Sequence, residues 1–274
     1  MDRAEKHERF KALHAGAGAF VMPNPWDAGT ARLLASMGFA ALATTSAGLA
    51  FGLGRCDGQG ALSRDEVLEN ARRIAGAVEV PVSADLENGY GATPEAVEET
   101  MRLAAEAGLV GASVEDASGD AARPIYDFEE AVARVRAAVD GAKGRHLMIT
   151  ARAENYLWGH PDLDDTIRRL QAFGEAGADV LYAPGLPDLQ AIATVVRAVD
   201  KPVNVVMGLR PPFYSVAELA AVGVRRISVG GSFARAAFGA VRDAAEEVLG
   251  AGTFGYSERA MPGAEIAAVM KGDG

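Results

Sequence analysis

The sequence predicts an α/β fold of the TIM type, a closed (β/α)₈ barrel formed by a single domain over residues 1–274. A short apolar strand follows a glycine-terminated helix again and again along the chain. Eight such strands can be placed, and no Pro-, Gly- or Ser-rich linker divides them. Alternating strand and helix units form parallel sheets, and eight units favour closure into a barrel. The length of 274 residues and the 49% apolar content suit one barrel.

The expected strands can be placed in chain order. Glycines 38, 108, 177 and 223 each end a helical stretch and precede an apolar run, as a helix C-cap glycine does before a buried parallel strand. Other strands are expected from apolar runs alone. The eight predicted strands cover residues 20–22, 39–44, 80–86, 109–114, 147–151, 178–182, 202–206 and 224–229.

Both ends of the chain carry helices beyond the repeat. The charged, amphipathic N-terminal stretch predicts a helix with His7 and His14 on its surface. An eighth barrel helix is expected at 233–249, followed by a Gly-rich hinge and a last short helix at 263–270. The extension 256–274 is surplus to a barrel. It is therefore free to pack on a neighbouring subunit, or to be swapped between subunits of a dimer or tetramer.

Composition narrows the classes of partner. The net charge of -10 argues against binding to nucleic acid or anionic membranes, which needs clustered Lys and Arg. A single cysteine, Cys56, excludes an internal disulfide framework. There is no apolar signal core and no apolar run long enough for a membrane span. We expect a cytoplasmic protein that acts on a small molecule.

Acidic residues follow two adjacent predicted strands where the reacting residues of a barrel lie. Asp85 and Glu87 are two residues apart, so in an extended strand they would point to the same side. Glu115 ends the next strand and Arg152 the one after. One such acid is more often a strand or helix cap, but adjacent inward acids repel each other unless a cation lies between them. Oxygen ligands favour Mg²⁺ or Mn²⁺ over Zn²⁺.

These residues belong to motifs that resemble the isocitrate lyase/phosphoenolpyruvate mutase superfamily. The resemblance runs in the right order from about residue 20 to about residue 240, so it does not depend on any single motif. The motifs are Pro-Asn-Pro-Trp-Asp-Ala at 23–28, Thr-Thr-Ser-Ala-Gly at 44–48, Gly-Arg-Cys-Asp-Gly at 54–58, Ser-Ala-Asp-Leu-Glu-Asn-Gly-Tyr-Gly at 83–91, Val-Glu-Asp at 114–116 and Thr-Ala-Arg at 150–152.

The resemblance implies roles for individual residues. Asp85 would bind Mg²⁺ directly, and Asp57, Glu87 and Glu115 would hold the water shell of the metal. Arg152 would grip the substrate and stabilise the negative charge of an enolate. The substrate carboxylate would lie on the turn Thr45, Ser46 and Ala47, where successive backbone N–H groups form an anion nest. Tyr90, between two glycines, either covers the site or only fills the loop, and we favour the first interpretation.

The segment 116–127 departs from the superfamily pattern. Isocitrate and methylisocitrate lyases carry a Lys-(Lys/Arg)-Cys-Gly-His segment there, and this chain has neither the Cys nor the His. Arg123 is its only cation, and either closes over a substrate carboxylate or stays solvated before Pro124. Cys56 and His160 are other polar residues near strand ends, for which inert loop positions are the simpler interpretation.

The resemblance implies Mg²⁺-dependent cleavage of a small 2-oxo acid through an enolate. Decarboxylation of an oxaloacetate-like acid is favoured, since water can protonate the enolate when the loop acid is missing. The alternatives are a C–P bond enzyme (a phosphonopyruvate hydrolase or phosphonomutase), a folate-dependent ketopantoate hydroxymethyltransferase, and a protein that binds a 2-oxo acid without turnover. Gly230 and Gly231 resemble a phosphate cradle but are interpreted first as turn residues.

Overall fold

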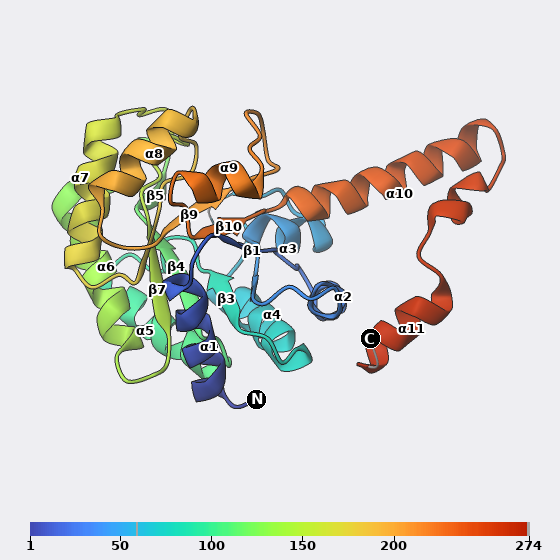
Figure 1. The fold of residues 1–274 in the computed structure, drawn as a ribbon, viewed down its shortest axis with the longest axis horizontal. Helices are drawn as coiled ribbons and strands as arrows, with labels where there is room; N and C mark the ends of the chain where they lie inside the picture. Colours follow the sequence, from blue (N-terminus) through green and yellow to red (C-terminus); the bar gives the residue numbers. More distant parts are fainter. Residues whose placement is uncertain (59, 273–274) are drawn as a thin grey trace.

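Eight parallel strands form the centre of the computed structural model, which describes residues 1–58 and 60–272. Their order in the sheet is β1, β10, β9, β8, β7, β4, β3 and β2 (Figure 1). The strands are β1 (Phe20–Met22), β2 (Leu42–Ala43), β3 (Val82–Asp85), β4 (Gly111–Glu115), β7 (Met148–Arg152), β8 (Val180–Tyr182), β9 (Val203–Val206) and β10 (Arg226–Ser228).

The two ends of this sheet, β1 and β2, nearly close the ring. The backbone N–H of Ala43 donates to the carbonyl oxygen of Pro23, directly after β1, over 3.0 Å. Each strand overlaps the range that the sequence predicts, and the connections are parallel throughout. The α/β, TIM-like class with eight parallel strands is therefore confirmed.

Helices cover the outer face of the strands. Most begin at an Asp, Ser or Thr whose side chain accepts a hydrogen bond from the first helical turn, as for Asp27, Ser63 and Asp188. The helices are α2 (Ala28–Ser36), α3 (Ser46–Gly52), α4 (Arg64–Ala77), α5 (Pro94–Glu106), α6 (Phe128–Ala142), α7 (Leu163–Glu175), α8 (Leu189–Ala198) and α9 (Val216–Ala221).

Two apolar layers hold the barrel together. Outward side chains such as Ile149 and Leu181 pack between the strands and the helices. Inward side chains such as Met22 and Val180 form a separate cluster inside the barrel. Because side chains alternate along a strand, the inward position of Val180 also turns Tyr182 inward.

The N-terminal helix α1 (Arg3–Ala15) closes the end of the barrel opposite the functional strand ends. Phe10 is 1% exposed and packs in the cluster inside the barrel. His14 is 4% exposed, so the expected surface position of His14 is wrong. The cause is tertiary: the His14 ring packs against Phe10 and Phe20, with ring centroids 4.6 Å and 5.0 Å away, and one ring nitrogen faces Arg226.

The segment after β4 forms a small antiparallel hairpin. Its strands are β5 (Ala117–Asp120) and β6 (Arg123–Ile125). The backbone N–H of Tyr126 donates to the carbonyl oxygen of Asp116 over 2.8 Å, which ties the far end of the hairpin back to β4. The segment expected as a short loop is thus an ordered hairpin.

The C-terminal helix α10 (Ser232–Gly250) extends away from the barrel (Figure 1). The chain then turns through η1 (Gly255–Arg259) into α11 (Gly263–Lys271), which lies beside α2. Arg32 of α2 donates to the carbonyl oxygen of Met270 over 3.0 Å. No helix in the described part of the chain is both long enough and apolar enough to span a membrane.

Candidate active site

Asp85, the last residue of β3, lies among donors from three neighbouring elements. Its carboxylate accepts from Ser46 Oγ over 3.1 Å and from Ser113 Oγ over 3.4 Å. Arg152 Nη1 donates to it over 2.9 Å. The backbone N–H of Asp85 also donates to Thr44 Oγ1 over 3.1 Å. Side chains from α3, β4 and β7 therefore converge on this one carboxylate.

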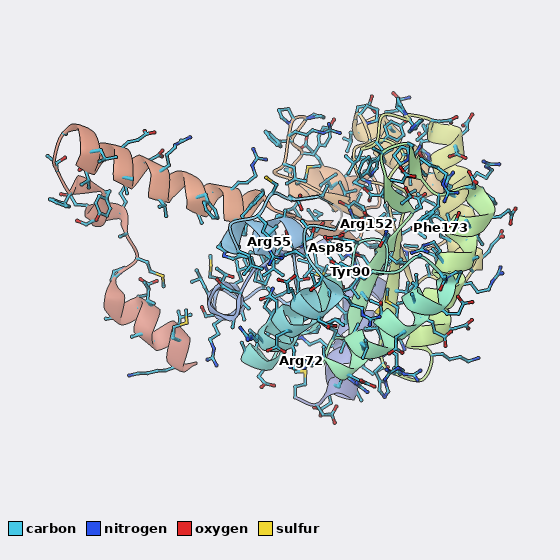
Figure 2. All side chains as sticks on the ribbon, turned by 180° about the vertical axis from the view of Figure 1, so that it is seen from behind. Arg55, Arg72, Asp85, Tyr90, Arg152 and Phe173 are labelled. Carbon is cyan, nitrogen blue, oxygen red and sulfur yellow. The ribbon has the colours of Figure 1, made fainter. Side chains whose placement is uncertain are left out.

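Arg152, the last residue of β7, meets three carboxylates. Figure 2 labels it beside one of them, Asp85. Its Nε lies 2.8 Å from Glu154, Nη1 lies 2.9 Å from Asp85, and Nη2 lies 3.1 Å from Glu115. Burial opposes the charge of this guanidinium, but the three carboxylates hold the pKa of Arg152 well above its usual value. Glu115 is directly opposite Arg152 in the strand register, which explains their meeting.

The four predicted metal-site acids line one cavity of about 260 Å³. Burial raises the pKa of Asp57, and the nearby Asp85 raises it further. The pKa of Glu87 is raised to about 7, first by burial and then by Asp85. Burial and the negative charge of Asp85 thus disfavour the ionised forms of both Asp57 and Glu87. The predicted acids are Asp57, Asp85, Glu87 and Glu115.

The donor chemistry of this cavity fits a hard divalent cation. All four acids offer oxygen ligands, and a cation among them would relieve the crowding of like charges. Asp85, Glu87, Glu115 and Asp57 are the residues that would hold it, directly or through water. Within the described residues, no three acidic, His or Cys side chains already converge on one point. Arg152 occupies the space between Asp85 and Glu115 instead.

Glu87 reaches the cavity by a different backbone path from the one expected. The strand ends at Asp85, and Glu87 has a φ of 45°, so the predicted extended geometry across 85–87 is wrong. Tyr90 has a φ of 54° and is likewise left-handed. Its hydroxyl is buried near Glu87, without a well-aligned hydrogen bond. Such backbone strain in a non-glycine residue persists only where the surroundings fix it.

A second cavity, of about 280 Å³, opens on the other side of Asp85 and Arg152. The turn Thr45, Ser46 and Ala47 lines it where α3 begins. Residues from β8 to β10 form the opposite wall. They are Tyr182, Asn204, Val206, Arg226 and Ser228, with Arg210 at the exposed loop after β9.

Comparison with known proteins agrees with the fold and with the residues gathered here. The family model for phosphoenolpyruvate phosphomutase matches residues 10–249. The chain belongs to the isocitrate lyase/phosphoenolpyruvate mutase superfamily.

Three similar proteins illustrate the range of this superfamily. A Burkholderia cenocepacia J2315 crystal structure of inferred lyase/mutase class is 56% identical, with a TM-score of 0.94 over 97% of this chain and 95% of that one. An oxaloacetate decarboxylase from Pseudomonas aeruginosa is 28% identical over 92% of this chain and 89% of its own. The 2-methylisocitrate lyase of Escherichia coli is 30% identical over 81% of this chain and 76% of its own.

Three predicted candidates lie away from the cavities of this superfamily member. Arg123 is half exposed and pairs with Asp127 and Glu130, so the structure does not bring it to the site. Cys56 is exposed in the loop after α3. His160 is exposed on the loop before α7 and lines only a shallow surface hollow.

Two backbone N–H groups of the glycine turn before α10 are already engaged. Asn24 Oδ1, from the loop after β1, accepts from the N–H groups of both Val229 and Gly230 over 2.9 Å. Gly230 has a φ of 53°. The interpretation of Gly230 and Gly231 as turn residues, rather than a phosphate cradle, agrees with this contact.

Sequence reasoning missed several polar residues that belong to the site. Glu154 pairs with Arg152 from the loop after β7, and Tyr182 and Arg226 line the larger cavity. The alternation of inward and outward positions along β8 and β10 could have found Tyr182 and Arg226. Both are large polar residues at inward positions, where most barrels place Val, Ile or Leu.

Proposed function

We propose that this chain is a Mg²⁺-dependent lyase that decarboxylates a small 2-oxo acid of the oxaloacetate type. One observation carries the proposal: Asp57, Asp85, Glu87 and Glu115 line one cavity, with Arg152 among them. Membership of a superfamily of C–C lyases and mutases supports this chemistry.

Different residues of the chain would bind such a substrate and stabilise the charge that forms on it. The turn Thr45, Ser46 and Ala47 faces the cavity and would hold the substrate carboxylate through backbone N–H groups and hydroxyls. A bound Mg²⁺ would supply positive charge to the oxo and carboxylate oxygens. Arg152 would stabilise the negative charge that grows on the oxo oxygen as the C–C bond breaks. The substrate anion competes with Asp85, Glu115 and Glu154 for that guanidinium.

The hairpin after β4 favours decarboxylation over cleavage that needs an acid on this segment. Its residues 116–127 include neither Cys nor His, and Arg123 is paired on the surface. Loss of CO₂ leaves its electron pair on an enolate, and the departing group itself needs no proton. A C–P bond enzyme stays an alternative, with phosphonopyruvate as its substrate.

The test is a pyruvate-release assay over oxaloacetate, phosphonopyruvate and methylisocitrate, with Mg²⁺ and with EDTA. We expect Mg²⁺-dependent turnover of oxaloacetate, and a fall in kcat/KM of about 100-fold or more in Asp85→Ala. Asp140→Ala, on the exposed side of α6, is the matched control and should keep wild-type activity.

Each other outcome points elsewhere. Turnover that survives both EDTA and Asp85→Ala contradicts the proposal. Phosphate release from phosphonopyruvate without turnover of oxaloacetate favours the C–P enzyme. Binding of these acids without any product, under every metal condition, favours a 2-oxo-acid-binding protein.

A further inference from the structure

We propose that Tyr182 is the acid that protonates the carbon of the enolate after the C–C bond breaks. This assignment rests on the proposed function, in which an enolate forms beside Arg152. It supplies the proton donor that the segment 116–127 lacks.

Tyr182 lies at the level of the reacting groups. It ends β8 and is directly opposite Arg152 in the parallel register of β7 and β8. Its side chain turns into the barrel and lines the cavity of about 280 Å³, together with Asp85 and Ser46. The residue is 8% exposed, and no described residue forms a hydrogen bond to its hydroxyl. A buried tyrosine usually has a partner for this group, so the hydroxyl is available to a ligand in the cavity.

The other titratable groups around this cavity are poor donors. Besides Tyr182, they are two aspartates, Asp57 and Asp85, and the arginines 152, 210 and 226. The aspartates belong to the predicted cation site, where they are needed as carboxylates. Three carboxylates hold Arg152 protonated, and Arg226 already donates through Nε and Nη2 to Asn204 and Thr150. No His, Cys or Lys in the described part of the chain lines this cavity.

Two arginines can stabilise the phenolate that proton donation leaves behind. The Arg152 guanidinium carbon lies 5.1 Å from the centroid of the Tyr182 ring. Burial raises the pKa of Tyr182, and Glu154 and Asp85 add to the rise, whereas Arg152 and then Arg226 oppose it. Arg226 is 3% exposed and lines the same cavity. A tyrosine that keeps its proton at neutral pH is suited to act as an acid in this step.

Unlike Arg152, Arg226 has no carboxylate among its hydrogen-bond partners. Its Nε donates to Asn204 over 2.8 Å and its Nη2 donates to Thr150 over 3.0 Å. Its Nη1 lies 3.4 Å from the His14 ring nitrogen. Because none of these partners is a carboxylate, the charge of Arg226 is not neutralised locally. A guanidinium has five N–H donors, so three contacts leave donors for the cavity.

The proposed step balances as follows. The C–C bond of the 2-oxo acid breaks, CO₂ leaves, and the electron pair stays on the three-carbon enolate. The carbon of the enolate then forms a new C–H bond with the proton of the Tyr182 hydroxyl, which gives pyruvate. The O–H electron pair stays on the phenolate oxygen. Water in the cavity returns a proton to Tyr182, and the resulting hydroxide combines with CO₂ as bicarbonate.

Exchange of the methyl hydrogens of pyruvate in D₂O tests this step without reference to the departing group. The exchange is the reverse of enolate protonation, and NMR follows it with Mg²⁺ present. We expect Tyr182→Phe to slow exchange by at least about 100-fold, the lower end of the usual contribution of general acid–base catalysis. Phe keeps a ring face for Arg152, so Mg²⁺-dependent binding of oxalate, an enolate analogue, should stay within about threefold by calorimetry.

Tyr214→Phe is the matched control, because its hydroxyl accepts a hydrogen bond from the backbone of Leu189, outside this cavity. It should leave both measurements unchanged. Equal exchange in wild type and Tyr182→Phe, or a wild type that binds oxalate but exchanges nothing, overturns the role of Tyr182 and leaves the proposed function standing. A wild type that binds neither oxalate nor pyruvate overturns both.

Discussion

Arg152 and Arg226 each place a guanidinium inside the barrel, in opposite electrostatic surroundings. Arg152 meets three carboxylates, whereas Arg226 meets Asn204, Thr150 and His14. Burial lowers the pKa of Arg226 to about 9. The cavity between them therefore has an acidic wall on the β3–β4 side and a cationic wall on the β10 side. This polarity would orient a substrate that has both an oxo group and a carboxylate.

The burial of His14 beside the same arginine makes stability depend on pH. The ring Nδ1 lies 2.8 Å from the carbonyl oxygen of Phe10, and its other nitrogen faces Arg226. Burial, and then Arg226, lower the pKa of His14 from 6.5 to about 3. Between those two values the unfolded chain binds a proton that the folded chain does not. The folded state therefore has the full stability of a neutral, buried His14 above pH 6.5, and this stability is lost as the pH falls towards 3.

The unfolding free energy of the wild type should fall between pH 7 and pH 5. We expect that fall to be about 2 kcal/mol smaller in His14→Gln. Urea unfolding at the two pH values measures this difference. His160→Gln, on the exposed loop before α7, is the control and should follow the wild type. Parallel losses in the wild type and His14→Gln would show that His14 is protonated in the folded state.

At the scale of elements, α6 holds the strained loop that carries Glu87. Arg134 of α6 is 1% exposed and donates to the carbonyl oxygens of Asn88 and Gly91, each over 2.7 Å. It also donates to the carbonyl oxygen of Ala92 over 3.3 Å. Its guanidinium carbon lies 4.4 Å from the centroid of the Tyr126 ring. These contacts explain how left-handed residues in this loop keep their conformation.

Arg134→Lys should therefore affect both stability and the site. A lysine keeps the charge but cannot reach three carbonyls at once, so we expect a loss of about 2–3 kcal/mol in unfolding free energy. Mn²⁺ affinity, measured by electron paramagnetic resonance, should fall by about 10-fold because Glu87 loses its support. Arg136→Lys, exposed on the same helix, is the matched control. Unchanged Mn²⁺ affinity in a destabilised Arg134→Lys would limit this arginine to a structural role.

The elements that the sequence predicted are those with a strong local signal. Helix-ending glycines and apolar runs located the strands, and the acids after β3 and β4 lie together because parallel strands end at one edge. The hairpin 117–125 was missed because its strands are short and polar, without an apolar alternation. The backbone path of Glu87 depends on the contact of its loop with Arg134 of α6. The burial of His14 depends on its contacts with Phe10 and Arg226. No local sequence pattern contains these contacts.

At the scale of the whole molecule, α10 lacks the protein contacts that a helix of its length needs. Its first turns are anchored where Phe238 meets Phe51 of α3, with ring centroids 6.2 Å apart. Beyond that point, Val241 is 69% exposed and Leu249 is 88% exposed. Ala234 is the only buried residue among the described residues of α10. A lone helix is marginal in water, and apolar side chains on one projecting arm form a typical interaction surface.

We propose that the exposed apolar side chains of α10 pack on a second copy of this chain, which would give the predicted dimer or tetramer. Light scattering after size exclusion should give a dimer or tetramer for the wild type, and Val241→Glu with Leu249→Glu should shift it towards the monomer. Asp243→Ala, at a polar position of the same helix, should leave the oligomer intact. A monomeric wild type would contradict the proposal.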